Sequence, residues 1–102
     1  MEGYDVRDEE KGITFTIPRF YVDDPEELYD EYKKEIFEAI VNSTIMMVAQ
    51  DYDTIPCFVM NEDICNIHAD SIHVNLDKAL EYYANEEMYE TCKEIKNLKL
   101  YL

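Results

Sequence analysis

Residues 24–50 read DPEELYDEYKKEIFEAIVNSTIMMVAQ, and this stretch has the strongest local signals in the chain. Asp24 is a good N-cap, Pro25 suits the first helical position, and Glu27 is the third residue after the cap. The pattern predicts one helix from about Pro25 to about Gln50, with an apolar stripe on one side. That stripe consists of Leu28, Tyr32, Ile36, Ala39, Ile40, Ser43 and Met47.

The opposite side of this predicted helix changes character halfway along. Its first half carries acids and is expected on the surface, whereas its second half carries Val41, Ile45 and Val48. A helix that is apolar all round is usually a buried helix. We therefore expect the second half either in the core or in a contact between subunits, which keeps a homodimer as an alternative.

Shorter runs with strand character flank the helix on both sides. Residues 12–20 alternate between apolar and polar side chains, which predicts a half-buried strand ended by Pro18. The apolar run 54–60 predicts a second strand, since it is rich in β-branched and aromatic residues. A turn at 61–63 is expected to return the chain along residues 64–68 as a third strand.

The two ends of the chain carry weaker patterns. Residues 1–11 are polar and partly acidic, and we expect a loose acidic arm there. Residues 71–76 fit both a strand and a helix, and their alternation favours a strand. A helix is then expected from Asp77 to about Asn97, interrupted near Asn85.

Together these elements predict an α+β fold, in which a small antiparallel sheet has two main helices packed on one face. The length of 102 residues suits a single domain, residues 1–102. The hydrophobic fraction of 47% is enough to build a core despite the high charge.

The charge balance excludes several classes of partner. The chain has 9 Lys and Arg against 24 Asp and Glu, a formal net charge of −15. This charge repels phosphate backbones and anionic lipids, so we expect no direct nucleic-acid binding and no membrane association. The longest apolar run, residues 45–49, is too short to span a bilayer, and the N-terminus lacks the pattern of a signal peptide. With an odd number of cysteines, three, a cytoplasmic location fits best.

Few residues carry a catalytic or metal-binding pattern. Cys57, Cys65, His68 and His73 are zinc-type ligands, but the usual close pair of cysteines is missing from them. A nucleophile formed by Cys65 or Cys92 with a histidine is disfavoured, because the surrounding carboxylates suppress thiolate formation. The acids near residues 51–53 lack the glycine of a calcium loop. We predict no cofactor, no metal and no enzymatic activity, with a small Cys/His metal protein or enzyme as an alternative.

The acids themselves are unevenly distributed. Eight of the sixteen residues from Asp23 to Glu38 are acidic. In a straight helix this row would extend roughly 24 Å, with one carboxylate about every 3 Å, close to the roughly 3.4 Å spacing of phosphates along one DNA strand. Tyrosines that stand among acids suit a protein interface. The predicted partner-binding residues are Asp23, Glu27, Asp30, Glu31, Glu35, Glu38, Tyr29, Asp51, Tyr52 and Asp53.

In its small size, its acidity and its lack of a catalytic signature, the chain resembles the small acidic phage-encoded anti-defence proteins. These include anti-CRISPR proteins and antirestriction DNA mimics. The resemblance implies an inhibitor that occupies the basic nucleic-acid groove of a nuclease or CRISPR effector in the host cytoplasm. An immunity or antitoxin protein that neutralises a basic nuclease toxin has the same electrostatics and remains the alternative.

Overall fold

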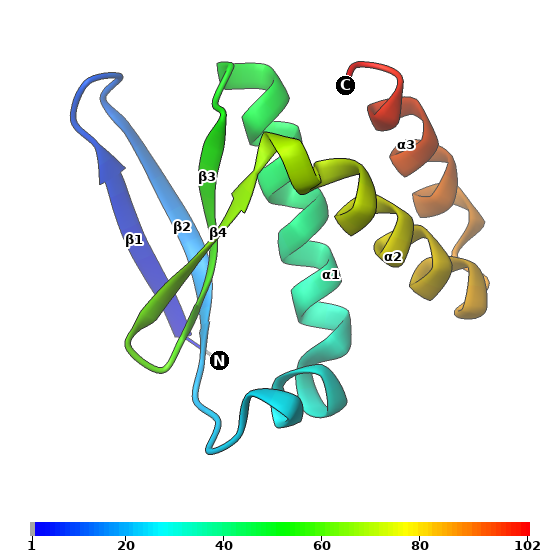
Figure 1. Cartoon of the computed structure of the whole chain (residues 1–102), viewed down its shortest axis with the longest axis horizontal. Coiled ribbons are helices and arrows are strands. Elements are labelled where there is room, and N and C mark those ends of the chain that lie inside the picture. Colours follow the sequence, from blue (N-terminus) through cyan, green and yellow to red (C-terminus); the bar gives the residue numbers. More distant parts are fainter. Residues whose placement is uncertain (1) are drawn as a thin grey trace.

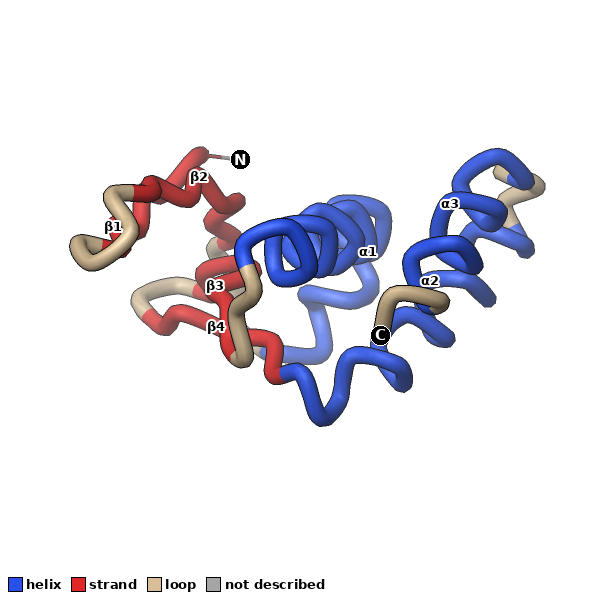
Figure 2. The backbone as a smooth tube through the Cα atoms, turned by 90° about the horizontal axis from the view of Figure 1, so that it is seen from above, coloured by secondary structure: helices blue, strands red, loops and turns tan. Residues whose placement is uncertain are grey.

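The computed structural model describes residues 2–102, which form a four-stranded sheet with three helices on one side (Figure 1, Figure 2). Helix α1 lies against the sheet, α2 packs on α1, and α3 packs on α2 as the outermost layer. The elements are β1 (Glu2–Asp8), β2 (Ile13–Phe20), α1 (Pro25–Gln50), β3 (Thr54–Met60), β4 (Asp63–His68), a 3-10 turn (Ala69–Ser71), α2 (Ile72–Asn85) and α3 (Tyr89–Lys99). In residues 2–102 no helix is both long and apolar enough to cross a membrane.

The sheet has the strand order β1-β2-β3-β4 and is mixed. The two hairpins, β1–β2 and β3–β4, are antiparallel, as expected for adjacent strands joined by a short turn. Strands β2 and β3 are parallel, because α1 carries the chain back to the same end of the sheet between them. The predicted α+β class is therefore confirmed, while the purely antiparallel sheet is corrected to a mixed one.

The N-terminal residues form a strand, so the prediction of a loose arm is wrong. Strand β1 pairs with β2 along its whole length, from Glu2 opposite Arg19 to Asp8 opposite Ile13. Its alternate side chains, which include Tyr4, are half-buried against the core. Strand β2 also continues through Pro18 to Phe20. Proline is tolerated there because β3 joins β2 only from Arg19 onward, so no β2–β3 ladder bond is needed from Pro18.

Helix α1 has the predicted bounds and the predicted cap. The Asp24 carboxylate accepts a hydrogen bond from the Glu26 amide at 3.0 Å. The predicted stripe is buried except for Tyr32, which is half-buried. Tyr32 has φ −121° and ψ 26°, outside the helical range, so α1 changes direction at this residue (Figure 1). The single straight row of carboxylates from Asp23 to Glu38 therefore does not form.

The segment 71–76 is helical, so the predicted strand is wrong. Helix α2 begins at Ile72 and buries Ile72, Leu76, Ala79 and Tyr83, which lie at helical spacing. A strand with the alternating pattern would also have buried Val74. In the structure Val74 is 56% exposed. Packing against α1 selects the helical stripe. The predicted interruption near Asn85 is confirmed, since α2 ends there.

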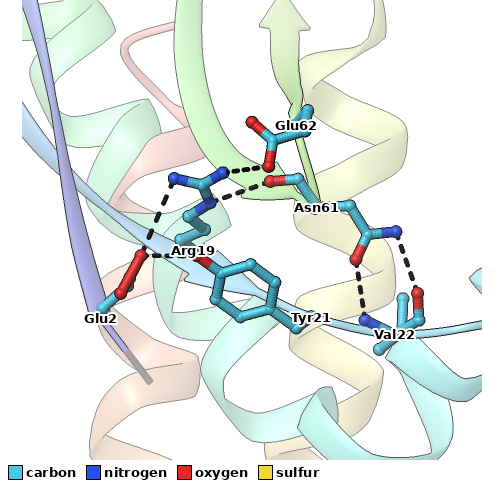
Figure 3. Close-up of polar contacts among 6 residues, drawn as sticks. All are labelled: Glu2, Arg19, Tyr21, Val22, Asn61 and Glu62. Atoms are coloured by element: carbon cyan, nitrogen blue, oxygen red, sulfur yellow. Dashed lines mark hydrogen bonds and ion pairs between the residues drawn. The ribbon is translucent and has the colours of Figure 1, made fainter.

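A polar clasp joins the β1–β2 hairpin to the turn between β3 and β4 (Figure 3). Arg19 Nε donates to the Asn61 carbonyl at 2.8 Å, and the Arg19 guanidinium lies 2.7 Å from the Glu62 carboxylate. The Asn61 side chain accepts from the Val22 amide at 3.0 Å and donates to the Val22 carbonyl at 2.9 Å. The Glu2 carboxylate completes the clasp by pairing with Arg19. These contacts hold the C-terminal ends of β2 and β3 together.

Candidate functional site

The start of α1 presents carboxylates that form no ion pair with the described residues. We call this the acidic segment, residues 23–31. Within residues 2–102, no Lys, Arg or His lies within ion-pair distance of its carboxylates. Tyr29 belongs to the same segment and is 54% exposed, and it lines a surface pocket with Lys33 and with Lys78 of α2. The six acids are Asp23, Asp24, Glu26, Glu27, Asp30 and Glu31, of which only Glu27 is half-buried. This segment is the site that the sequence predicted most directly.

Two of the predicted contact residues lie beyond the bend at Tyr32 and have different surroundings. Glu38 lies 3.9 Å from the Lys34 ammonium, and Glu35 is half-buried. Burial raises the pKa of Tyr82, and these two carboxylates raise it further. Glu35 and Glu38 therefore border the junction of α1 and α2 and do not extend the acidic segment in a straight line.

The predicted residues 51–53 lie at the far end of α1 from the acidic segment (Figure 1). Asp51 caps the helix in a left-handed conformation with φ 55°. The Tyr52 hydroxyl donates to the Asp8 carboxylate, and its ring packs edge-on against Phe15 with centroids 5.4 Å apart. Tyr52 is thus engaged in internal contacts. Because α1 separates Asp51, Tyr52 and Asp53 from the acidic segment, the two sets do not form one contact face.

The second half of α1 leaves little apolar surface for the homodimer alternative. Val41 is buried within the chain and Val48 is half-buried. Only Ile45 stays exposed among the three apolar residues that suggested a subunit contact. Helix α2 packs against α1 on the side away from the sheet, so the chain itself uses apolar surface of α1 there (Figure 2).

The cysteine and histidine residues are not brought together as a metal-ligand set. Cys57 is buried in β3, and His73 is exposed in α2. His68 Nδ1 lies 3.0 Å from the Thr54 hydroxyl. Across residues 2–102, no three His, Cys, Asp or Glu side chains are arranged to hold a metal ion. Burial raises the pKa of the Cys57 thiol to about 11, and burial also raises that of Cys65, so both thiols are protonated at neutral pH.

Three side chains have raised pKa values, and we therefore expect the folded protein to lose stability at alkaline pH. Burial raises the pKa of Tyr52 and Tyr83 to about 12 and that of Cys57 to about 11. The unfolded chain releases these protons at lower pH than the folded chain, so their stabilisation is complete below the unfolded pKa values and is lost as pH rises through the folded ones. Urea denaturation should give a free energy of unfolding that falls steadily from about pH 9 to about pH 12.

The matched control for this titration is Tyr52→Phe. Because the variant lacks one of the titrating groups, its free energy of unfolding should fall less steeply over the same pH range. A parent protein equally stable at both ends of the range would contradict the assignment of these groups. So would a variant whose stability follows the parent in parallel.

Comparison of the chain with protein-family models, with curated proteins and with solved structures found no match.

Proposed function

We propose that this protein is an inhibitor that binds a cationic protein surface through its acidic segment. One observation carries the proposal: six carboxylates fall within the nine residues 23–31, and none of them forms an ion pair within residues 2–102. Like charges this close destabilise a helix by a few tenths of a kcal/mol for each i,i+4 pair, such as Glu27 and Glu31. A basic partner would relieve that repulsion on binding.

The proposed target surface is the nucleic-acid groove of a nuclease or CRISPR effector. The helical part of the segment, residues 25–31, extends about 10 Å, which corresponds to roughly three phosphates of one DNA strand. The bend at Tyr32 limits the mimicry to this short stretch. Exposed Tyr29 adds a ring that can stack on an arginine of such a groove.

The proposed mode of action is binding without catalysis. Opposite charges steer two proteins together and raise association rates by about 10- to 1,000-fold at low salt. Salt screens this attraction over about 8–10 Å at physiological ionic strength. Inhibition by this route should therefore weaken as salt is added.

The test is a pull-down with a CRISPR effector nuclease and with a restriction endonuclease, each repeated at rising salt. The proposal expects capture at low salt that declines as salt increases, because the contact is electrostatic. Preloading the nuclease with its DNA or guide RNA should also block capture, since both ligands would occupy the same groove. Capture that ignores salt and preloading would contradict the proposal.

A further inference from the structure

Helices α2 and α3 form an antiparallel hairpin with a groove along one side. Figure 2 shows α3 on the far side of α2 from the sheet, so the hairpin is the outermost part of the fold. The groove has a volume of about 480 Å³, and most of its lining is apolar. It is lined by Asp77, Leu80, Glu81 and Ala84 of α2 and by Tyr89, Cys92 and Lys96 of α3.

Exposed apolar side chains extend both walls of this groove. Tyr89 lines it at the turn between the helices and is 66% exposed. On α2, Val74 lies two helical turns before Glu81 on the same side of the helix, and it is 56% exposed. On α3, Leu100 lies one turn after Lys96 and is 83% exposed. Exposed apolar surface of this kind, bordered by charged residues, is typical of a protein contact.

The two walls carry opposite charges. Glu81 lies on the α2 wall and Lys96 on the α3 wall, and both side chains are exposed. Within residues 2–102 neither of them forms an ion pair. Asp77 is already paired with Lys99. The groove therefore offers a partner one free acid on one wall and one free base on the other.

This arrangement is complementary to a second copy of itself. Rotation by 180° about an axis parallel to the helices lays α2 of one copy on α3 of the other, so that the acidic wall meets the basic wall. Rotation about an axis across the helices would instead lay α2 on α2, with acid against acid. The Cys92 thiol lies 3.9 Å from the Leu80 carbonyl, so Glu81 and Lys96 lie about one turn apart along the groove. The flexible four-carbon stem of a lysine can bridge that offset.

The net charge of −15 opposes self-association, but it opposes it least at this face. Residues 88–102 contain three lysines and only two glutamates, whereas the acidic segment at the start of α1 contains six acids and no base. At physiological ionic strength, charges further apart than about 8–10 Å are largely screened. The short-range pairs and the apolar contacts at the groove are then the main terms.

We propose that the protein forms a two-fold symmetric dimer by packing its α2–α3 groove against that of a second copy. The apolar side chains of Leu80, Ala84 and Tyr89 form the centre of the contact. Two symmetric pairs, Glu81 of each copy with Lys96 of the other, select this orientation over the α2-on-α2 one. The contact uses neither the acidic segment nor the second half of α1, and the inference does not depend on the function proposed above.

The experiment is sedimentation velocity on the full chain at about 0.15 M salt, from about 10 μM to about 1 mM protein. The proposal expects the mass to rise with concentration from that of one chain toward that of two, and no further, because a two-fold contact is closed. A protein that stays monomeric at about 1 mM, or that grows beyond two chains, would overturn the dimer. Either result leaves the proposed inhibitor function as it stands.

Charge exchange tests the orientation. Glu81→Lys and Lys96→Glu should each weaken the dimer by about tenfold or more, and the double variant should regain it, because the exchanged pair is again complementary. Glu81→Lys lowers the net negative charge, so a dimer limited by total charge would become stronger in this variant. The matched control Glu31→Lys makes the same charge change in the acidic segment and should not weaken the dimer. A double variant weaker than both single ones would contradict the assigned pairs.

Ala84→Arg tests the apolar centre of the groove. Position 84 is exposed within one chain, so the monomer should keep its fold, and circular dichroism would check this. An arginine there fills the groove and should weaken the dimer by about tenfold or more, although it too lowers the net negative charge. A folded variant that dimerises as well as the parent would place the contact elsewhere and overturn the proposal.

Discussion

Replacing Glu27, Asp30 and Glu31 together by lysine should slow association with the target nuclease by about 10- to 1,000-fold at low salt. The three carboxylates lie on the first turns of α1 and form no ion pair within residues 2–102. Lysines at these positions turn electrostatic attraction into repulsion. Stopped-flow or surface-based kinetics would measure the association rate, and the difference from the parent should shrink as salt rises.

A matched variant separates the local field from the total charge. Glu86→Lys, Glu90→Lys and Glu94→Lys change the net charge by the same amount on exposed positions at the end of α2 and in α3. If the acidic segment makes the contact, this control should bind nearly as fast as the parent. Equal slowing in both triple variants would mean that overall charge is responsible. If the variant with lysine at positions 27, 30 and 31 inhibits as well as the parent, the contact face lies elsewhere on the protein.

Replacing Asn61 by alanine should lower the free energy of unfolding by about 3 kcal/mol. The change removes both side-chain hydrogen bonds to the Val22 main chain, at 2.9 and 3.0 Å. An unsatisfied, partly buried amide or carbonyl costs about 1–3 kcal/mol. Asn61 also has φ 56°, a left-handed conformation that asparagine tolerates better than alanine. Urea denaturation followed by circular dichroism would measure the loss.

The glycine variant at the same position separates the two causes. Asn61→Gly loses the same side-chain hydrogen bonds but adopts a positive φ at little cost. It should therefore be more stable than the alanine variant by about 1 kcal/mol and less stable than the parent. An alanine variant within about 0.5 kcal/mol of the parent would contradict the role assigned to the clasp.

Local sequence signals predicted α1 and β3 best. The Asp24 cap, Pro25 and the apolar stripe act within one segment, and the helix has the bounds that they indicated. Strand β1 was missed because its stability comes from pairing with β2, and its own residues are mostly polar. Residues 72–76 fitted two periodicities, and the choice between them depended on the packing of α2 against α1.

The acidic segment was visible in the order of residues, because charge density along a chain needs no fold to be counted. The grouping of those acids in space was not visible. The bend at Tyr32 turns Glu35 and Glu38 away from the row, and α1 carries residues 51–53 to its other end.

Composition, net charge and the capped central helix are properties of neighbouring residues, so the order of amino acids was enough to establish them. The parallel β2–β3 pair and the clasp beside it join residues about 40 positions apart. Such contacts exist only after the chain has packed, because the gain from burying α1 and the sheet together offsets the entropy of closing that long loop.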